Sequence, residues 1–336
     1  MKGLLVERWN GSAWSLARVP LPAGTSQAVL SGVACIARDC TAVGSYHRAG
    51  GVFTLVERWS GGHWSVQSSP NAANASRQWG SMLVQVSCGS STSCVALGEY
   101  GKPGEAGNST AQTLVERWNG GRWTIVRVPV ATVSRTVQSL AGVSCVAKMC
   151  VAVGEKASTN PAVEHGMPVA EIMRLGVWSV QSLPPDKQPA AGLNSVSCSS
   201  STSCTAVGSS GTTLLVERWN GASWSLQNAP DPYPNSNPVS AVSCLAADEC
   251  TAVGSSPGEV FKPLVAQWNG SSWAVQQAPA PPPAPANGTA DGSQLVAVSC
   301  TPARTCMAVG YSITPTGTGH NIGGDIFRAL AVSYTP

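Results

Sequence analysis

The chain has 336 residues, of which 11% are charged, and its formal net charge is +3. So small and scattered an excess of positive charge argues against a nucleic-acid or anionic-membrane partner. No apolar run approaches the roughly 18 residues of a membrane-spanning helix, so we expect no membrane insertion. The length fits two ordinary domains or one large repeat domain.

The N-terminal segment starts like a signal peptide. Met1 is followed by an apolar stretch, but Glu7 and Arg8 interrupt it within a few residues. A secretory signal peptide contains an uninterrupted apolar region, so no signal peptide is visible. Whether this N-terminus is the native one stays open.

A block of the type Leu-Val-Glu-Arg-Trp-Asn-Gly-x-x-Trp recurs along the chain. Its copies lie at 5–14, 55–64, 114–123, 169–178, 215–224 and 264–273, and the copy at 169–178 is the most degraded. Asn-Gly between two strand-like runs favours a β-hairpin. A two-residue turn would set Glu7 opposite Trp14, whereas a four-residue turn would pair Trp9 with Trp14 across the strands. The spacing alone does not decide between them.

A second block separates these copies. It contains Val-Ser-Cys, a short polar loop and Cys-x-Ala-Val-Gly, and it lies at 33–44, 86–98, 143–154, 196–208, 242–254 and 298–310. Each copy has two short apolar runs around a loop and predicts a further hairpin. The first cysteines of successive copies are 46 to 57 residues apart. This variation indicates loop insertions around a constant strand framework.

Two hairpins give four strands per repeat of about fifty residues, which is the size of a β-propeller blade. We therefore predict an all-β, six-bladed β-propeller of four-stranded antiparallel blades, forming a single domain over 1–336. The chain starts on an outer hairpin and ends on an inner one, so the N- and C-terminal strands are expected to close it. The segment 327–334 is an alternative third strand for the closing blade, with Tyr334 in place of the first Trp. A truncated seven-bladed parent is the other alternative.

The twelve cysteines form six close pairs. The pairs are Cys35 with Cys40, Cys88 with Cys94, Cys145 with Cys150, Cys198 with Cys204, Cys244 with Cys250, and Cys300 with Cys306. Each pair flanks a hairpin loop, where facing positions are within disulfide reach, so we predict six local bridges in an exported protein. Zinc is less favoured because the spacing is not Cys-x-x-Cys and no histidine lies near. Buried free thiols in a cytosolic protein are the third alternative.

The repeated Glu-Arg-Trp triplet, represented by Glu57, Arg58 and Trp59, is a candidate ligand-binding site. A carboxylate and a guanidinium can bind sugar hydroxyls, and an indole can cover an apolar sugar face. The competing interpretation is packing, with the arginine stacked on a tryptophan and paired with an acidic group. Identical placement in every blade favours packing. The triplet also fades at 171–173 and 266–268.

Trp79 is the one tryptophan outside the repeat, in the loop 71–80. We expect it to be exposed on one propeller face, where loops contact ligands. The four histidines, His47, His63, His165 and His320, show no metal-ligand spacing, so no metal site and no cofactor are expected. The chain contains no catalytic motif. A propeller enzyme could still use single residues such as Asp325, Arg328, Tyr46, Tyr100 and Tyr311.

The two repeated blocks resemble those of uncharacterised secreted β-propeller proteins of actinobacteria, over nearly the whole chain. The Asn-Gly-x-x-Trp turn is also similar to the Asp-box turn of sialidase-like propellers, with Asn in place of Asp. The arginine cluster of sialidases has no counterpart here. A third similarity is to small fucose-binding propeller lectins, although Glu57 precedes Trp59 by two positions where those lectins have three. These resemblances imply a propeller fold and a lectin alternative.

The sequence as a whole favours a secreted or cell-surface, non-catalytic binding or scaffold propeller. Its partner is expected to be a protein or a glycan at the cell surface, and the chain is expected to be monomeric. The first alternative is a carbohydrate-binding lectin that uses the Glu-Arg-Trp triplet. The second is a glycan-active hydrolase or lyase whose catalytic residues follow no motif.

Overall fold

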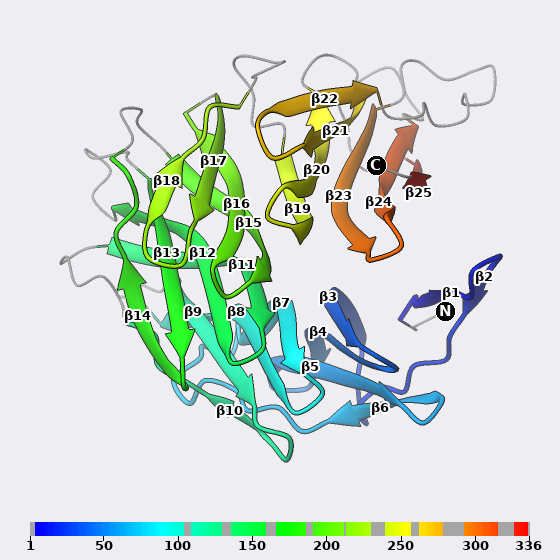
Figure 1. Cartoon of the computed structure of the whole chain (residues 1–336). Helices are drawn as coiled ribbons and strands as arrows, with labels where there is room; N and C mark the ends of the chain where they lie inside the picture. Colours follow the sequence, from blue (N-terminus) through cyan, green and yellow to red (C-terminus); the bar gives the residue numbers. More distant parts are fainter. Residues whose placement is uncertain are drawn as a thin grey trace. The chain divides into compact units, whose positions relative to one another are not determined.

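The computed structural model describes residues 4–103, 109–129, 136–158, 166–185, 191–211, 213–229, 239–256, 262–277, 292–314 and 326–334. All regular structure in these residues is β-strand, and they include no helix able to span a membrane. The fold is the predicted six-bladed β-propeller of antiparallel sheets (Figure 1). The strands fall into two compact units, residues 1–152 with 171–180 and residues 153–170 with 181–336. The single domain over 1–336 stays a prediction.

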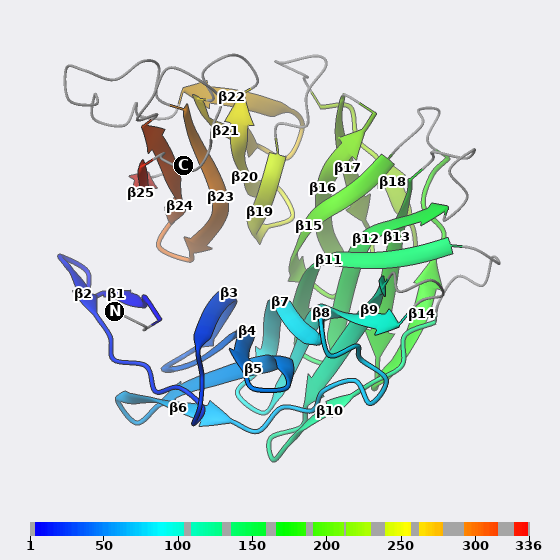
Figure 2. The ribbon, with the colours of Figure 1, turned by 180° about the vertical axis from the view of Figure 1, so that it is seen from behind.

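Five sheets have four strands in sequence order. Blade 1 contains β3 (Gln27–Ile36), β4 (Asp39–Arg48), β5 (Gly51–Ser60) and β6 (His63–Gln67). Blade 2 contains β7 (Ser81–Ser90), β8 (Ser93–Pro103), β9 (Ser109–Trp118) and β10 (Trp123–Ile125). Blade 3 contains β11 (Thr136–Val146), β12 (Met149–Ser158), β13 (Met167–Arg174) and β14 (Val177–Gln181). Figure 2 shows β3 and β7, the first strands of blades 1 and 2, beside each other.

Blade 4 contains β15 (Ala191–Ser200), β16 (Ser203–Ser210), β17 (Thr213–Trp219) and β18 (Trp224–Leu226). Blade 5 contains β19 (Val239–Ala246), β20 (Glu249–Ser256), β21 (Lys262–Trp268) and β22 (Trp273–Gln277). Blade 6 is a three-stranded sheet of β23 (Gly292–Thr301), β24 (Thr305–Thr314) and β25 (Ile326–Tyr334). Each blade therefore repeats the predicted order of an inner hairpin followed by outer strands.

The N-terminal and C-terminal strands belong to different sheets. The N-terminal hairpin of β1 (Glu7–Trp9) and β2 (Trp14–Leu16) is a two-stranded sheet of its own. The C-terminal strand β25 is the third strand of blade 6, as the alternative assignment of 327–334 predicted. Tyr334 faces Cys306 in the same register in which Trp59 faces Cys40 in blade 1. The strand register is therefore the same in blade 6, although a tyrosine replaces the tryptophan at this position.

The outer hairpins adopt the register of the four-residue turn, in which the two tryptophans face each other. In blade 1 the strands extend further, so that Ser60 also pairs with His63. Trp9 is paired with Trp14, and the corresponding tryptophans of blades 1, 2, 4 and 5 are paired in the same way. The side-chain oxygen of Asn10 accepts hydrogen bonds from the backbone N–H groups of Ser12 and Ala13, both at 2.9 Å. Gly11 has a φ of 105°, which a glycine adopts without strain. In the N-terminal hairpin the Asn-Gly dipeptide thus favours the register that aligns the indoles, and blade 1 has the same register with Ser60-Gly61 in its place.

The glycine of Cys-x-Ala-Val-Gly lies on the second strand of a blade, opposite a β-bulge in the first strand. In blade 2 the register shifts between Leu83 and Gln85, opposite Gly98. A Cβ atom on Gly98 would lie 2.0 Å from the carbonyl oxygen of Met82. Gly44, Gly208 and Gly310 are equally close to a first-strand carbonyl, with distances between 1.9 and 2.0 Å. Only a residue without a side chain fits there.

The core lies between neighbouring sheets. Leu55 and Val56 of β5 are both buried, which confirms that the adjacent apolar residues of this strand pack on both faces. Val56 belongs to a cluster that includes Leu83 and Leu114 of blade 2. In the other unit, Val216 of blade 4 packs with Leu264 of blade 5 in the same way. Within each unit, a blade is therefore stabilised by the next one along the chain.

All six predicted disulfides are formed, each within one hairpin. They join Cys35 to Cys40, Cys88 to Cys94, Cys145 to Cys150, Cys198 to Cys204, Cys244 to Cys250, and Cys300 to Cys306. No free cysteine occurs in the described part of the chain, and no group of His, Cys, Asp or Glu side chains there could hold a metal ion. The disulfide interpretation of the cysteine pairs is therefore confirmed.

The bridges link the first and second strands of every blade. The second cysteine of each pair is more deeply buried than the loop that it closes, and Cys150, Cys204 and Cys250 are all inaccessible or nearly so. In blades 4 and 5 the two bridged cysteines also face each other directly in the strand register. Each disulfide thus links the two strands of an inner hairpin, next to the core that lies between neighbouring blades.

Candidate functional site

The structure separates the members of the Glu-Arg-Trp triplet. Glu57 and Arg58 are neighbours on β5, so their side chains leave opposite faces of the strand. The carboxylate of Glu57 is fully buried, and neither of its oxygens has a hydrogen-bond partner in the described residues. Burial raises the pKa of Glu57 to about 7. Glu57 is thus an interior group of the blade, whereas Arg58 and Trp59 are only partly buried.

The same buried glutamate recurs in blades 2 and 3. The Ser69 hydroxyl donates to Glu116 at 2.8 Å, and the Gln138 amide donates to Glu171 at 2.6 Å. Burial raises the pKa of each carboxyl group to about 7, and these hydrogen bonds act weakly in the opposite direction. Both donors lie outside the repeated motif and could not be identified from it.

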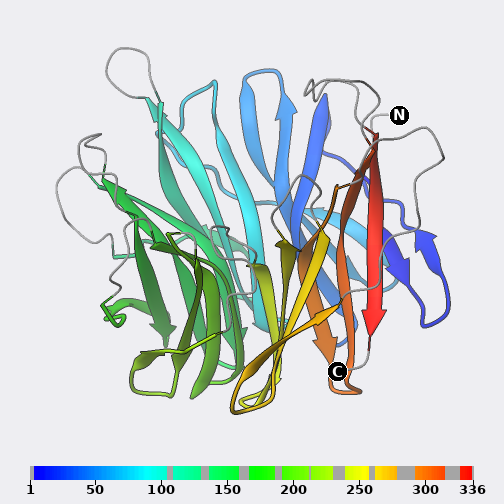
Figure 3. The same cartoon turned by 90° about the horizontal axis from the view of Figure 1, so that it is seen from above.

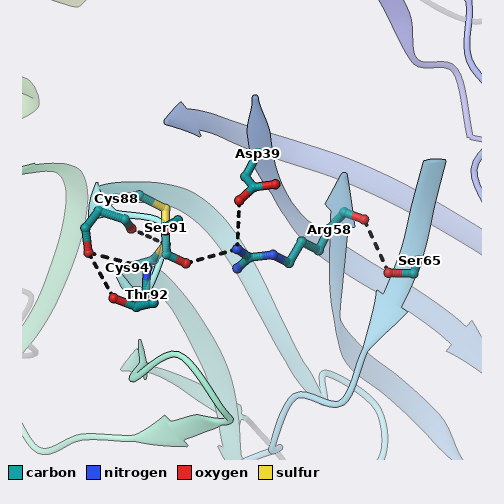
Figure 4. A network of polar contacts seen from close by, with 8 residues as sticks. Asp39, Arg58, Ser65, Cys88, Ser91, Thr92 and Cys94 are labelled. Carbon is teal, nitrogen blue, oxygen red and sulfur yellow. Dashed lines mark hydrogen bonds and ion pairs between the residues drawn. A yellow bond between two sulfur atoms is a disulfide. The ribbon is translucent and has the colours of Figure 1, made fainter. Parts of the chain in front are cut away.

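The arginine of the triplet links one blade to the next. Arg58 donates from Nη2 to the carbonyl oxygen of Ser91 at 3.0 Å and to Asp39 at 3.4 Å (Figure 4). Its guanidinium lies 5.6 Å from the ring centroid of Trp118. Arg8 stacks on Trp59 and Arg218 on Trp268 in the same manner, at 5.2 and 4.9 Å. The packing interpretation therefore describes these contacts correctly.

Next to one such arginine lies a cavity of about 580 Å³, the inter-blade pocket. It is formed by blades 4 and 5, and its lining includes Thr202, Arg218, Asn220, Gln227, Asp248 and Trp268. Burial lowers the pKa of Arg218, and the charge of Asp248 opposes that shift. The pocket thus combines a partly buried guanidinium with a carboxylate, two amides and an indole.

A second cavity, of about 480 Å³, is built from the corresponding elements at the other end of the repeat array. This N-terminal pocket is lined by Arg8, Arg18, Trp59, His63 and Trp64, among others. Trp59 and Trp64 are partly exposed here, whereas Trp219 and Trp268 of the inter-blade pocket are buried. Arg-Trp elements of the repeat thus line both pockets, with different accessibility of the indoles.

Trp79 is 54% exposed, as expected. Its backbone N–H donates to the hydroxyl of Ser76 at 3.1 Å, and Gly80 donates to the Ser76 carbonyl at 2.8 Å. The turn is tied to β8, because Ser76 donates to the carbonyl of Gly101 and Gly101 donates to that of Gly80. Ser76 and Gly101 were not recognised from sequence, since neither is part of a motif.

The single residues considered for catalysis that the structure describes lie on different strands. Tyr46 stacks on Phe53 in blade 1, Tyr100 lies in β8, and Tyr311 lies in β24. Arg328 is part of β25. His47 and His63 lie at opposite ends of blade 1. His165, His320 and Asp325 are outside the described residues.

No protein-family model and no curated protein matches this sequence. Solved structures match it in fold. A Trypanosoma rangeli sialidase in complex with sialic acid has a TM-score of 0.54 at 10% identity, and the match covers 98% of this chain and 57% of the sialidase chain. AofleA from Arthrobotrys oligospora has a TM-score of 0.50 at 13% identity, covering 89% of both chains.

A variant of Aleuria aurantia lectin in complex with alpha-methyl-L-fucoside has a TM-score of 0.50 at 10% identity, with 90% of this chain and 95% of that chain covered. At these identities the likeness shows the fold alone. This chain spans little more than half of the sialidase chain.

Proposed function

We propose that this protein is an exported, carbohydrate-binding propeller whose ligands enter the pockets between adjacent Arg-Trp elements. The inter-blade pocket carries the proposal, because it places Arg218 beside Asp248 and Asn220 in a cavity of about 580 Å³. That volume falls within the roughly 300–1,000 Å³ of small-molecule sites. A guanidinium, a carboxylate and amides together can donate to and accept from sugar hydroxyls.

The two pockets are expected to bind sugars differently. Arg218 already covers the face of the buried Trp268, so the inter-blade pocket recognises its ligand mainly through hydrogen bonds. In the N-terminal pocket, Trp59 and Trp64 are partly exposed and can contribute an apolar ring face. The fold likeness to a lectin in complex with alpha-methyl-L-fucoside supports the same class of ligand.

The test is isothermal titration of the oxidised protein against a panel of neutral mono- and oligosaccharides. We expect saturable binding that Arg218→Gln weakens by about tenfold or more, since a charge-assisted hydrogen bond is worth roughly 1.5–3 kcal/mol. Arg122→Gln is the matched control, because Arg122 lies in the exposed turn of blade 2. Absence of binding across the panel, or equal binding by both variants, would overturn the proposal.

Export is proposed from the cysteines. Six hairpin disulfides persist only where the surroundings are oxidising. Peptide mapping under non-reducing conditions, on protein taken from the native host, is expected to find all six local bridges outside the cytoplasm. Free thiols in that sample would contradict an exported protein.

A further inference from the structure

We infer that Trp79, together with Arg77 and Arg48, forms a second binding site that takes an acidic polysaccharide, one carrying carboxylate or sulfate groups. The inference rests on the proposed function for its ligand class, but it concerns a surface separate from the Arg-Trp pockets. Neither pocket is lined by any of these three residues.

The first argument is the rigidity of the loop that carries Trp79. Four hydrogen bonds link Ser76, Trp79, Gly80 and Gly101, with lengths between 2.6 and 3.1 Å. A turn whose backbone is already held in place loses little conformational freedom when the indole that it carries binds a ligand. An exposed tryptophan on a fixed turn is therefore ready to act as a binding anchor.

The second argument is the close fit of the chain beneath this turn. A Cβ atom on Gly101 would lie 2.3 Å from the Cβ atom of Trp79, and one on Gly80 would lie 2.0 Å from the carbonyl oxygen of Val52. The turn can approach blades 1 and 2 this closely only because glycine occupies both positions. The position of the turn that carries the indole is thus set by its close contact with blades 1 and 2 as well as by its own hydrogen bonds.

The third argument is the positive charge next to the turn. Gly51 begins β5, pairs with Arg48 across the hairpin, and would place a Cβ atom 2.8 Å from the carbonyl oxygen of Arg77. Arg48 and Arg77 are both exposed, and neither is in an ion pair within the described part of the chain. The backbone of Arg77 therefore lies against the β4–β5 hairpin that contains Arg48, and this hairpin belongs to the blue blade of Figure 3.

The orientation of one cation is also set. The guanidinium of Arg48 lies 4.6 Å from the ring centroid of Phe53, which stacks on Tyr46 at 5.5 Å. Stacking fixes the plane of the guanidinium while its N–H groups remain free to bind anions. The surface thus offers a flat apolar ring and two positive charges, to which a sugar ring and acidic groups along a polysaccharide are complementary.

The experiment is a titration of the full chain with polygalacturonate, using a neutral polysaccharide of similar length as the reference. We expect Trp79→Ala to weaken binding of polygalacturonate by about tenfold or more, because the exposed indole provides the apolar face on which a sugar ring can stack. Arg48→Gln and Arg77→Gln should each weaken it severalfold. Affinity should also fall with rising salt concentration, since exposed charges are screened.

Two controls make the result specific. Arg122→Gln removes an exposed arginine elsewhere and should leave polygalacturonate binding unchanged. Arg218→Gln should reduce binding of neutral sugars only, so failure of the pocket proposal is distinguishable from failure of this one. The inference is overturned if polygalacturonate does not bind, if Trp79→Ala binds it normally, or if poly-glutamate binds with the same dependence on Trp79, which would indicate an acidic protein partner.

Discussion

The hydroxyl of Ser87 accepts a hydrogen bond from the backbone N–H of Cys145 at 2.9 Å and so joins the first strands of blades 2 and 3. Ser197 accepts from Cys244 at 2.9 Å, and Ser243 accepts from Cys300 at 3.1 Å. The serine of Val-Ser-Cys thus bonds to the cysteine of the following blade. The motif is a connection between blades as well as the site of a disulfide.

Replacing Ser87 by alanine should lower the free energy of unfolding by about 1–3 kcal/mol, because the buried N–H of Cys145 loses its partner. Chemical denaturation measures the change. Ser225→Ala is the control, since Ser225 is exposed and its bond to the Arg218 carbonyl is 3.4 Å long. Equal stability of the two variants would show that the inter-blade bond contributes nothing.

Gly98→Ala should be among the most damaging single substitutions. The added methyl group would lie 2.0 Å from the Met82 carbonyl oxygen, so the bulge must open, and we expect a loss above about 3 kcal/mol or failure to fold. Gly121→Ala is the matched control, because its Cβ would meet only the Asn119 side chain, at 3.7 Å. Thermal unfolding of both variants tests the difference. Similar melting temperatures would contradict the bulge constraint.

Stability should fall as the pH rises. The pKa values of Glu57, Glu116 and Glu171 are raised from 4.5 to about 7, so the folded state binds more protons than the unfolded state between these values. Their contribution is complete below pH 4.5 and is lost as the pH rises through 7, by about 1–3 kcal/mol for each group. Unfolding by denaturant at pH 5 and pH 8 measures this loss.

The variant Glu57→Gln should weaken that pH dependence, because the amide does not ionise. Glu7→Gln is the matched control, since Glu7 has the same place in the repeat but is exposed in the N-terminal hairpin. If both variants keep the full pH dependence of the parent, the buried carboxyl of Glu57 is not its source.

Removing one bridge, with Cys88 and Cys94 both replaced by alanine, should cost about 2 kcal/mol, the loop-closure value for a short loop. Equilibrium unfolding of the oxidised protein measures the cost. The local pairing predicts that the remaining cysteines still form hairpin bridges. Long-range pairs in a non-reducing peptide map would contradict it.

Much of the fold could be predicted because its signals are local. Each hairpin lies within about ten residues, the paired cysteines are five or six residues apart, and Asn-Gly marks the turn. The register of Trp9 and Trp14 could not be settled, because both turn lengths satisfy the same sequence. The structure decides it through the hydrogen bonds that Asn10 accepts.

The candidate sites could be predicted only in part. Arg218 and Trp268 belong to different repeats, about fifty residues apart, so no single motif shows that they meet. Adjacent residues such as Glu57 and Arg58 suggested one site, yet strand alternation directs them to opposite faces. The exposure of Trp79 followed from its place outside the repeat, whereas Ser76 and Gly101 have no sequence signal.

The buried glutamate is not present in every blade. Blades 1 to 4 contain Glu57, Glu116, Glu171 and Glu217 at this position, but blade 5 has Ala266 and blade 6 has Val332. Nearly identical repeats thus differ in whether their interior can take up a proton. Under alkaline conditions the blades should not loosen together: the protection factors of amide hydrogen exchange, which correct for the base-catalysed intrinsic rate, should fall first in the N-terminal blades and stay high in blades 5 and 6. The blades would then unfold in an order, starting at the N-terminal end, although their backbone structures are alike.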